Sequence, residues 1–339
     1  MILVTGATGS LGARLTRALV QRGQQVAILR RPDDPIDALD DAAAKVEHRL
    51  GDVRDYESVR AAMRDVSCVF HLAGLPPGVG RPLSSLTTAG GEMYEVHVRG
   101  TENVARAALE AGVTRLVHTS TAAAIGLPQA GTVATEDFPF GAARDDYMLT
   151  KHLAEEVLAS FAERGLETVI LNPTLVMAAG NYGLARIVML IKEAKIPAYP
   201  GGGLGLTTAP DVVDAHLKAM SRGVPGRRYI VNTVNLTYRE LFRAIARVVG
   251  SPAPRWPVPD WLLRGLGRLG SMTAGRGRRP ALNREIASLL TGTHYYDQSR
   301  AVAELGISQS PIEIAICEVY EWCKGLAAGQ RRQLLQGAF

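Results

Sequence analysis

Short apolar runs alternate with helical patterns over the first 172 residues. The runs lie at residues 2–4, 25–29, 46–50, 66–72, 115–119 and 168–171. Between them, apolar positions recur every three or four residues, as at Leu11, Leu15 and Leu19. This alternation predicts an α/β fold with a doubly wound parallel Rossmann sheet, whose ligands lie beyond the carboxyl ends of the strands.

The pattern becomes less regular after Asn172-Pro173. We expect helices at residues 182–194 and 211–222, and a strand at 229–232. Thr237 and Glu240 predict a capping box, and Ser310 and Glu313 a second one. A stretch rich in Pro, Trp, Gly and Arg at 251–280 shows no clear period.

This change of pattern predicts two domains. Residues 1–172 would form the NAD(P)-binding Rossmann domain. Residues 173–339 would form a smaller α+β substrate-binding lobe, with some return of the chain to the main sheet.

Three glycines follow the first apolar run at the spacing of a dinucleotide-binding turn. Gly6 would permit the sharp turn, Gly9 a close approach of the backbone to a pyrophosphate, and Gly12 close packing of the helix on the strand. The N–H groups at the start of the helix would then face the phosphates.

Composition and charge narrow the choice of partners. The chain is 47% hydrophobic and 21% charged with a net charge of +5, values typical of a globular protein. The densest basic cluster lacks aromatic residues and reads as a solvated loop, so no nucleic-acid partner is expected; it comprises Arg276, Arg278, Arg279 and Arg284. No apolar run is long enough for a membrane span. The cysteines show no metal-binding spacing, and we expect a cytoplasmic enzyme with reduced thiols.

Tyr147 and Lys151 are four residues apart on a predicted helix and therefore share a face. A nearby ammonium favours the phenolate and would lower the tyrosine pKa, which suits a general acid or base. Thr119, Ser120 and Thr121 place three hydroxyls at the end of a predicted strand. A structural reading, with an exposed tyrosine and threonines that fill the strand end, remains open for both features.

In combination, these motifs resemble the extended short-chain dehydrogenases/reductases. The motifs occur in the order Thr5-Gly-Ala-Thr-Gly-Ser-Leu-Gly12, Gly51-Asp-Val53, His71-Leu-Ala-Gly74, Thr119-Ser-Thr121, Tyr147-x-x-x-Lys151 and Asn172-Pro173. The most similar branch includes dihydroflavonol reductase, 3β-hydroxysteroid dehydrogenase and hopanoid-associated sugar epimerase-like proteins.

The resemblance implies a role for each matching residue. Tyr147 would be the general acid/base, Lys151 its partner and a contact of the nicotinamide ribose, and Thr121 the hydroxyl that orients the substrate oxygen. The cofactor would contact Gly6, Thr8, Gly9, Ser10, Leu11, Gly12, Arg30, Arg31, Asp52, Val53, Leu72, Ala73, Gly74, Thr119, Lys151, Asn172, Pro173, Thr174 and Val176. The substrate pocket would include Leu75, Thr121, Ala122, Tyr147, Asn172 and Tyr182.

Two departures from the pattern of the family stand out. His97 occupies the place of an asparagine that orders the active site in relatives, and is either functional or a packed or surface-facing histidine. Thr208-Ala209-Pro210 replaces a histidine–valine pair before the Asp-Val-Val turn, which alters the substrate lobe.

The expected function is an NAD(P)(H)-dependent oxidoreductase acting on a carbonyl or the matching secondary alcohol. Arg30 and Arg31 follow the second strand, where NAD-using relatives place an acid, and favour NADP(H) over NAD(H). The alternatives are a nucleotide-sugar epimerase with retained cofactor and a catalytically silent NADP-sensing protein. A 4,6-dehydratase is disfavoured because Ala122 and Ala123 replace its Asp-Glu pair.

The remaining expectations concern the substrate and the assembly. Tyr182, Tyr199, Trp256 and Trp261 either favour an apolar substrate or pack in the core. Relatives often dimerise through the helices expected here at 92–111 and 146–164, so a homodimer is predicted. The expected partner is a small-molecule substrate, with no metal.

Overall fold

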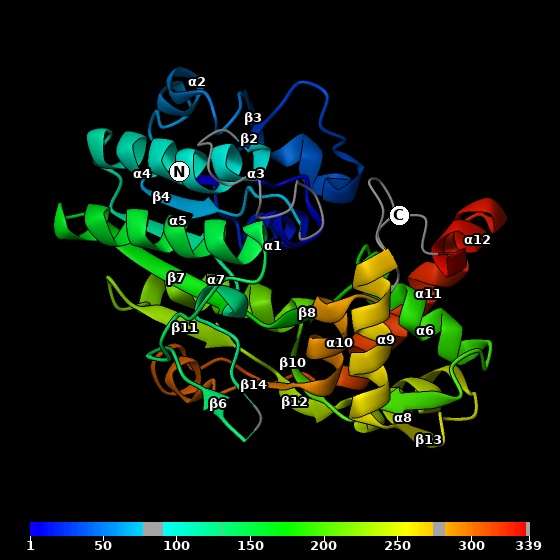
Figure 1. The fold of residues 1–339 in the computed structure, drawn as a ribbon. Coiled ribbons are helices and arrows are strands. Elements are labelled where there is room, and N and C mark those ends of the chain that lie inside the picture. Colours follow the sequence, from blue (N-terminus) through cyan, green and yellow to red (C-terminus); the bar gives the residue numbers. More distant parts are fainter. Residues whose placement is uncertain (77–90, 130, 274–281, 337–339) are drawn as a thin grey trace.

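A seven-stranded parallel sheet forms the centre of the computed structural model, which describes residues 1–76, 91–129, 131–273 and 282–336 (Figure 1). Residues 77–90, which follow the predicted pocket residue Leu75, lie outside this described part. The strand order is β11 (Arg228–Val231), β7 (Glu167–Pro173), β5 (Arg115–Thr119), β4 (Cys68–His71), β1 (Ile2–Thr5), β2 (Val26–Arg30) and β3 (Glu47–Leu50). Every adjacent pair is parallel, which confirms the predicted doubly wound sheet.

Helices cover both faces of the sheet because alternate strand residues point to opposite sides. Ile2 and Val4 of β1 pack in one core, and Leu3 packs in another. The first core lies beneath α1 (Ser10–Gln21) and α7 (Ala209–Arg222). The second lies beneath α2 (Tyr56–Ala61), α4 (Gly100–Glu110) and α5 (Asp146–Glu163), and α4 and α5 lie side by side (Figure 1).

The later half of the chain adds a second sheet and a third core. The order is β12 (Val234–Thr237), β10 (Gly203–Thr208), β14 (Thr293–Tyr296) and β6 (Val133–Ala134), with β8 (Leu175–Met177) also paired to β10. The third core holds α6 (Tyr182–Lys192), α8 (Tyr238–Val249) and α11 (Ile312–Gly325). A small two-stranded sheet joins β9 (Ala198–Pro200) to β13 (Trp256–Val258). Strand β11 and helix α7 return to the main sheet.

The capping predictions had opposite outcomes. The Thr237–Glu240 capping box is present at the start of α8, as predicted. The box predicted at Ser310 and Glu313 is wrong, because α11 begins after Pro311 without a side-chain cap. The hydroxyl of Ser310 instead donates to buried Asp211 at 2.6 Å, a long-range contact that local sequence does not reveal.

The stretch at 251–280 also differs from the sequence pattern. It contains α9 (Asp260–Thr273), which packs on α10 (Arg284–Thr291). Three glycines within α9 lower its intrinsic helix propensity, and so the sequence alone does not favour a helix here. The expectation that Trp256 and Trp261 pack in the core is wrong, because both side chains lie largely in water.

Further short elements complete the described part: η1 (Asp37–Lys45), η4 (Ala122–Ala124), η5 (Ala301–Leu305) and α12 (Ala328–Gln336). Across the described residues, no helix has both the length and the apolar character needed to cross a membrane.

The helix predicted at 92–111 is continuous but not uniform. It consists of α3 (Glu92–Tyr94), a π-helical segment η3 (Glu95–Arg99) and α4. A π turn inside an α-helix re-aims the side chains that it carries, and such turns frequently occur at functional sites. His97 lies within this segment.

The glycine turn is tightly packed at two of its three positions. Gly6 has φ +69°, a conformation that favours glycine. A Cβ on Gly12 would lie 2.1 Å from the Gly6 carbonyl oxygen, whereas one on Gly9 would lie 3.4 Å from it.

We therefore expect Gly12→Ala to lower the free energy of unfolding by about 2 kcal/mol or more, because backbone atoms must move to accept the methyl group. Gly9→Ala is the matched control, with an expected cost below about 1 kcal/mol. Urea unfolding of the cofactor-free protein measures both, and equal losses would contradict this account of the turn.

Candidate active site

Helix α5 places Tyr147 and Lys151 at the carboxyl edge of the main sheet. The helix begins after Asp145, whose carboxylate accepts the Met148 N–H at 2.8 Å. Tyr147 lies in the first turn and is half-buried, whereas Lys151 is 5% exposed. The ammonium of Lys151 donates to the Thr119 carbonyl at the end of β5, at 2.9 Å. The two side chains therefore come from the same helix and approach the end of one strand.

The three hydroxyls after β5 point to three different partners. The Thr119 hydroxyl pairs with His216 at 2.6 Å. The Ser120 hydroxyl donates to buried Glu155. The Thr121 side chain accepts the Ala123 N–H at 3.4 Å as the cap of η4, and its hydroxyl also acts to lower the pKa of Tyr147. The hydroxyls of Thr119 and Ser120 are thus committed to buried scaffold groups, whereas that of Thr121 influences the tyrosine.

The expected effect of Lys151 on the tyrosine is not observed. Burial raises the pKa of Tyr147 above its ordinary value, and the hydrogen bond from Thr121 opposes this rise. Burial also lowers the pKa of Lys151 to about 8, against a smaller opposing effect of Glu155. The prediction of a lowered tyrosine pKa is wrong for the protein alone, because burial disfavours the phenolate, the Asp145 carboxylate disfavours it further, and the Lys151 ammonium bonds a backbone carbonyl instead.

His97 is buried beside this pair. Its ring lies edge-on to Tyr147, with the centroids 5.7 Å apart. Nδ1 is 2.8 Å from the Thr150 hydroxyl, which itself donates to a main-chain carbonyl at 2.6 Å. Nδ1 therefore carries the proton, and Nε2 accepts the Leu75 N–H at 2.9 Å. Burial lowers the pKa of His97 to about 2, so the ring is neutral. A surface-facing histidine is excluded.

Three more buried histidines lie near the ends of β4 and β5, and sequence reasoning gave none of them a role. Burial lowers the pKa of His71 to about 3, that of His216 to about 4 and that of His118 well below the ordinary value. The rings of His71 and His118 are 5.1 Å apart. For His71 and His118 the position at the end of a predicted strand was the available signal, whereas His216 lies on α7. Because these imidazole rings stay neutral, the Lys151 ammonium is the positive charge among these buried side chains.

Glu155 is a second residue that sequence reasoning missed. It follows Lys151 by four residues on α5 and is 6% exposed. Its carboxylate accepts the Asn172 side-chain amide at 2.6 Å and lies 3.3 Å from Arg228. Asn172 also donates to the Thr121 carbonyl at 3.0 Å. Glu155 and Asn172 therefore hold the segment that carries the Thr121 hydroxyl.

The glycine turn forms a cradle at the same edge of the sheet. A Cβ on Gly6 would lie 2.6 Å from Ala73 N, so the turn packs directly on the residues after β4. The Ala73 N–H donates to Thr5 at 3.3 Å. Helix α1 begins after Gly9 without a side-chain cap and with no acid in its first turn. Its free N–H groups and positive dipole end suit a pyrophosphate, so the cradle fits a dinucleotide.

The adenosine end of the predicted site is crowded with charge. Arg31 donates to Asp34 at 2.8 and 3.0 Å, and Arg54 binds Asp52 through two nitrogens. Arg30 donates to His48 at 3.0 Å and to two carbonyls. No carboxylate of the described residues lies within ion-pair distance of Arg30. Among these three arginines, Arg30 is therefore the one that is not paired with an acid. The Asp52 carboxylate is already paired with Arg54.

The other predicted contacts are distributed unevenly. Gly74 lies beside His97 and Lys151, since its Cβ would be 3.3–3.4 Å from both side chains. Ala122 is buried in a small cluster that includes Ile230 and Tyr296. Tyr182 packs on Trp322 of α11 at 5.4 Å. Four further predicted cofactor contacts take part in contacts within the protein. The Ser10 hydroxyl donates to the Ala179 carbonyl, Val53 packs on Gly100, the Thr174 hydroxyl donates to Asn232, and Val176 pairs with Thr207 between β8 and β10. The remaining predicted residues lie around the glycine turn and the ends of the strands: Thr8, Leu11, Leu72 and Pro173.

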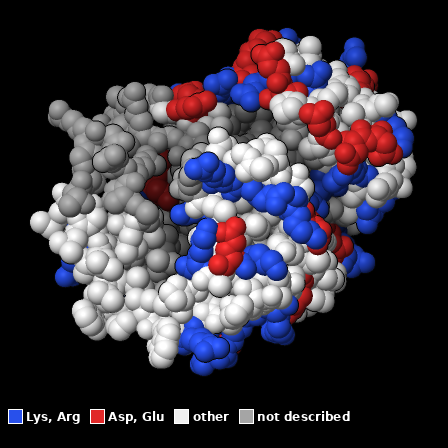
Figure 2. All heavy atoms as spheres, turned by 90° about the vertical axis from the view of Figure 1, so that its right-hand side faces the viewer, with Lys and Arg blue, Asp and Glu red and all other residues white. Residues whose placement is uncertain are grey.

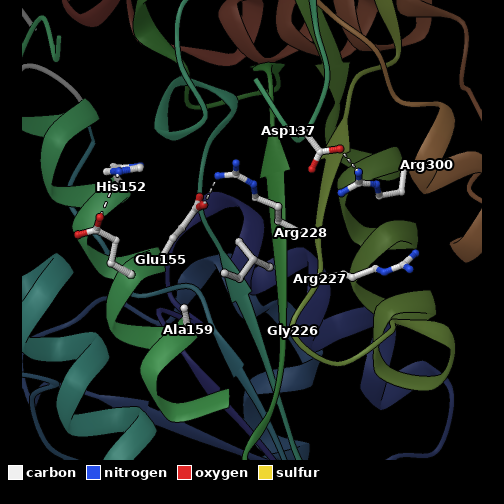
Figure 3. Close-up of a pocket in the computed structure, with 10 residues that line it drawn as sticks. Asp137, His152, Glu155, Ala159, Gly226, Arg227, Arg228 and Arg300 are labelled. Atoms are coloured by element: carbon white, nitrogen blue, oxygen red, sulfur yellow. Dashed lines mark hydrogen bonds and ion pairs between the residues drawn. The ribbon is translucent and has the colours of Figure 1, made fainter. Parts of the chain in front are cut away.

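A separate pocket of about 560 Å³ lies between α5 and the edge strand β11 (Figure 3). Figure 3 shows Arg228 directed toward Glu155, and Arg300 directed toward Asp137. Arg227 pairs with Glu304. Each arginine of this pocket is thus matched by an acid, and the pocket shares Glu155 with the hydrogen-bond network around Asn172 and Thr121. Among the described residues, no cluster of His, Cys, Asp and Glu could hold a metal ion.

Known proteins resemble the whole chain. Sterol demethylase protein B from Methylococcus capsulatus is 32% identical over 94% of this chain and 97% of its own length. A putative dihydroflavonol 4-reductase from Synechocystis sp. is 31% identical, covering 94% and 93%. The crystal structure of gox2253 has a TM-score of 0.82 at 28% identity, covering 96% and 98%.

The model of the NAD dependent epimerase/dehydratase family matches residues 2–232. This range includes the glycine turn, Thr121, Tyr147, Lys151 and β11. The chain therefore belongs to this family, within the extended short-chain dehydrogenases/reductases, and is an NAD(P)-dependent oxidoreductase.

Proposed function

We propose that this protein uses NADP(H) to reduce an aldehyde or ketone, or to oxidise the matching secondary alcohol, with Tyr147 as the proton donor or acceptor. The observation that carries the proposal is the buried Lys151, which lies one helical turn after Tyr147 on α5 and donates to the carbonyl of Thr119, two residues before Thr121. A phenol and a second hydroxyl on one oxygen atom form the donor pair that a reacting carbonyl requires.

In this mechanism the chain acts mainly by positioning protons. The Thr121 hydroxyl orients the substrate oxygen, and Tyr147 Oη donates its proton as negative charge develops there. The raised pKa of Tyr147 keeps the phenol protonated before reaction, which suits the reductive direction. Lys151 lies one helical turn after Tyr147 on α5. Its positive charge would favour the phenolate that remains after Tyr147 has donated its proton. When bound, the nicotinamide supplies or accepts the hydride.

The cofactor would be held at both ends by features of the fold. The α1 N-terminus and the glycine turn would face the pyrophosphate, and Gly74 and Lys151 the nicotinamide ribose. Arg30 would bind a 2′-phosphate, because its Nε and Nη1 donate only to neutral groups and can be redirected to the phosphate without breaking an ion pair. Arg31 would contribute less, since Asp34 already holds its guanidinium.

The substrate proposed is a largely apolar carbonyl compound. Two relatives bear names that refer to a sterol and to a dihydroflavonol, both built largely of apolar rings. We also propose that the enzyme is a homodimer through α4 and α5, which lie side by side on one face (Figure 1).

Tyr147→Phe should lower kcat by roughly 10²–10⁴ while cofactor binding is unchanged, because the ring stays and only the proton is lost. Thr121→Ser should retain most activity, and Thr121→Val should lose it, since serine keeps the donor. Steady-state kinetics with NADPH and a panel of aldehydes and ketones measures these effects. Similar rates for the two Thr121 variants would assign that residue to packing.

Arg30→Asp should weaken NADPH binding by about tenfold or more and spare NADH, because one charge-assisted contact contributes roughly 1.5–3 kcal/mol. Arg31→Gln is the matched comparison and should cost less, since Asp34 competes for that guanidinium. Fluorescence titration with both cofactors measures the effects. Equal affinity of the wild type for NADH and NADPH would instead favour an epimerase with retained cofactor.

The buried ammonium predicts a pH dependence of stability. The pKa of Lys151 is about 8 in the folded protein and near 10.5 when exposed, so the unfolded chain binds more protons between these values. The free energy of unfolding should therefore contain a contribution that rises by roughly 1–3 kcal/mol from about pH 8 to about pH 10. Lys151→Met should lack this rise, whereas Lys45→Met, at an exposed ion pair, should keep it. Urea unfolding at both pH values tests the difference between the variants, and identical slopes would contradict it.

A further inference from the structure

Lys151 and Glu155 are two charged side chains buried one helical turn apart on α5. Lys151 is 5% exposed and Glu155 6%, and their spacing of four residues places them on the same side of the helix. On the face drawn in Figure 2, by contrast, acidic and basic side chains lie next to one another at the surface. Water screens charges that are exposed, whereas buried charges act strongly on one another. The burial of Glu155 so close to Lys151 therefore affects the charge of the lysine.

One oxygen of the Glu155 carboxylate holds two strand ends. Oε1 accepts the Ser120 hydroxyl after β5 and, at 2.6 Å, the side-chain amide of Asn172 on β7. The same amide nitrogen donates to the Thr121 carbonyl at 3.0 Å. Both of these partners are acceptors, so the nitrogen of the amide must face them and the orientation of Asn172 is determined. Glu155 thereby fixes the Thr121 segment through Ser120 and through Asn172.

The other oxygen of Glu155 faces Arg228 of the edge strand β11, at 3.3 Å (Figure 3). The Arg228 side chain is 29% exposed and lines the pocket beside α5. Water therefore screens part of its positive charge, because the guanidinium lies at the border of the pocket. The negative charge of Glu155 is thus only partly balanced from this side, and it remains effective toward the interior.

The other titratable groups that face Lys151 carry no charge. Burial and the charge of Lys151 together lower the pKa of three histidine rings, which come from β4, η3 and β5: His71, His97 and His118. Burial raises the pKa of Tyr147, which keeps the phenol protonated. Among the described residues, Glu155 is the carboxylate whose charge raises the pKa of Lys151 against the effect of burial.

We propose that Glu155 is a positioning residue with two separable functions: its reach holds the Thr121 segment in place, and its charge keeps Lys151 in the ammonium form. The inference rests on the proposed function, because it takes Thr121 and Lys151 as groups that serve the reaction. The first function needs an acceptor oxygen at the right distance from Ser120 and Asn172. The second needs only a negative charge.

Two variants of Glu155 separate reach from charge in pH profiles of kcat, measured with NADPH from about pH 6 to about pH 10. Glu155→Gln keeps an acceptor oxygen but removes the charge. Its loss of activity on the alkaline side should therefore occur about half a pH unit or more below that of the wild type. Glu155→Asp keeps the charge but is one methylene shorter. Its alkaline midpoint should be unchanged, while its kcat falls by about tenfold or more.

Two further variants control for charge and for folding. Glu156→Gln removes the same charge from an exposed neighbour in the same pocket and should change neither quantity. Arg228→Met leaves Glu155 in place and removes the positive charge that opposes it. Its alkaline midpoint should move upward, the opposite direction to Glu155→Gln, so the proposal stays testable if Glu155→Gln does not fold. Circular dichroism checks the fold of each variant.

Urea unfolding provides a measurement that does not depend on turnover. The rise in the free energy of unfolding that Lys151 causes should begin at a lower pH in Glu155→Gln, because the folded lysine releases its proton earlier. This shift without any reductase activity would support the charge of Glu155 and count against the proposed function instead. Three outcomes would overturn the inference: a wild-type pH dependence of Glu155→Gln in both measurements, an equal shift in Glu156→Gln, or a kcat of Glu155→Asp no lower than that of Glu155→Gln.

Discussion

A single ammonium group, buried at the carboxyl edge of the main sheet, constrains the structure around it. Lys151 is almost fully removed from water, and its bond to the Thr119 carbonyl ties α5 to β5. A buried cation is costly, and a second one nearby would cost more. The neighbouring histidines are accordingly neutral, with their pKa values lowered by burial. Glu155, one turn along α5, offsets part of the cost without forming a direct ion pair with the lysine.

Burial at this edge of the sheet also gives the three neighbouring hydroxyl side chains different roles: some stabilise the fold, and one stays available for chemistry. Ser120 and Thr119 lie next to Thr121, yet their hydroxyls satisfy buried groups, Glu155 and His216. Buried polar atoms need such partners, since an unpaired one costs about 1–3 kcal/mol. The Thr121 hydroxyl and the half-buried Tyr147 are left at the edge where a ligand can arrive. His97 supports them from the π-helical turn by fixing the backbone at Leu75.

The sequence by itself determined the parallel sheet, the glycine turn and the placement of Tyr147 and Lys151 one turn apart on one helix, because each rests on local periodicity or short spacing. Strand runs, Gly6 with Gly12, and an i, i+4 spacing are readable within a few residues. Only the tertiary structure decided that the hydroxyls of Thr119 and Ser120 bond His216 and Glu155, that Lys151 bonds the Thr119 carbonyl, and that Asp34 holds Arg31. It also replaced the expected cap at Ser310 with a contact to Asp211 and turned an irregular stretch into α9. These features depend on groups distant in sequence, and burial, which sets their pKa values and exposure, exists only once the chain has folded.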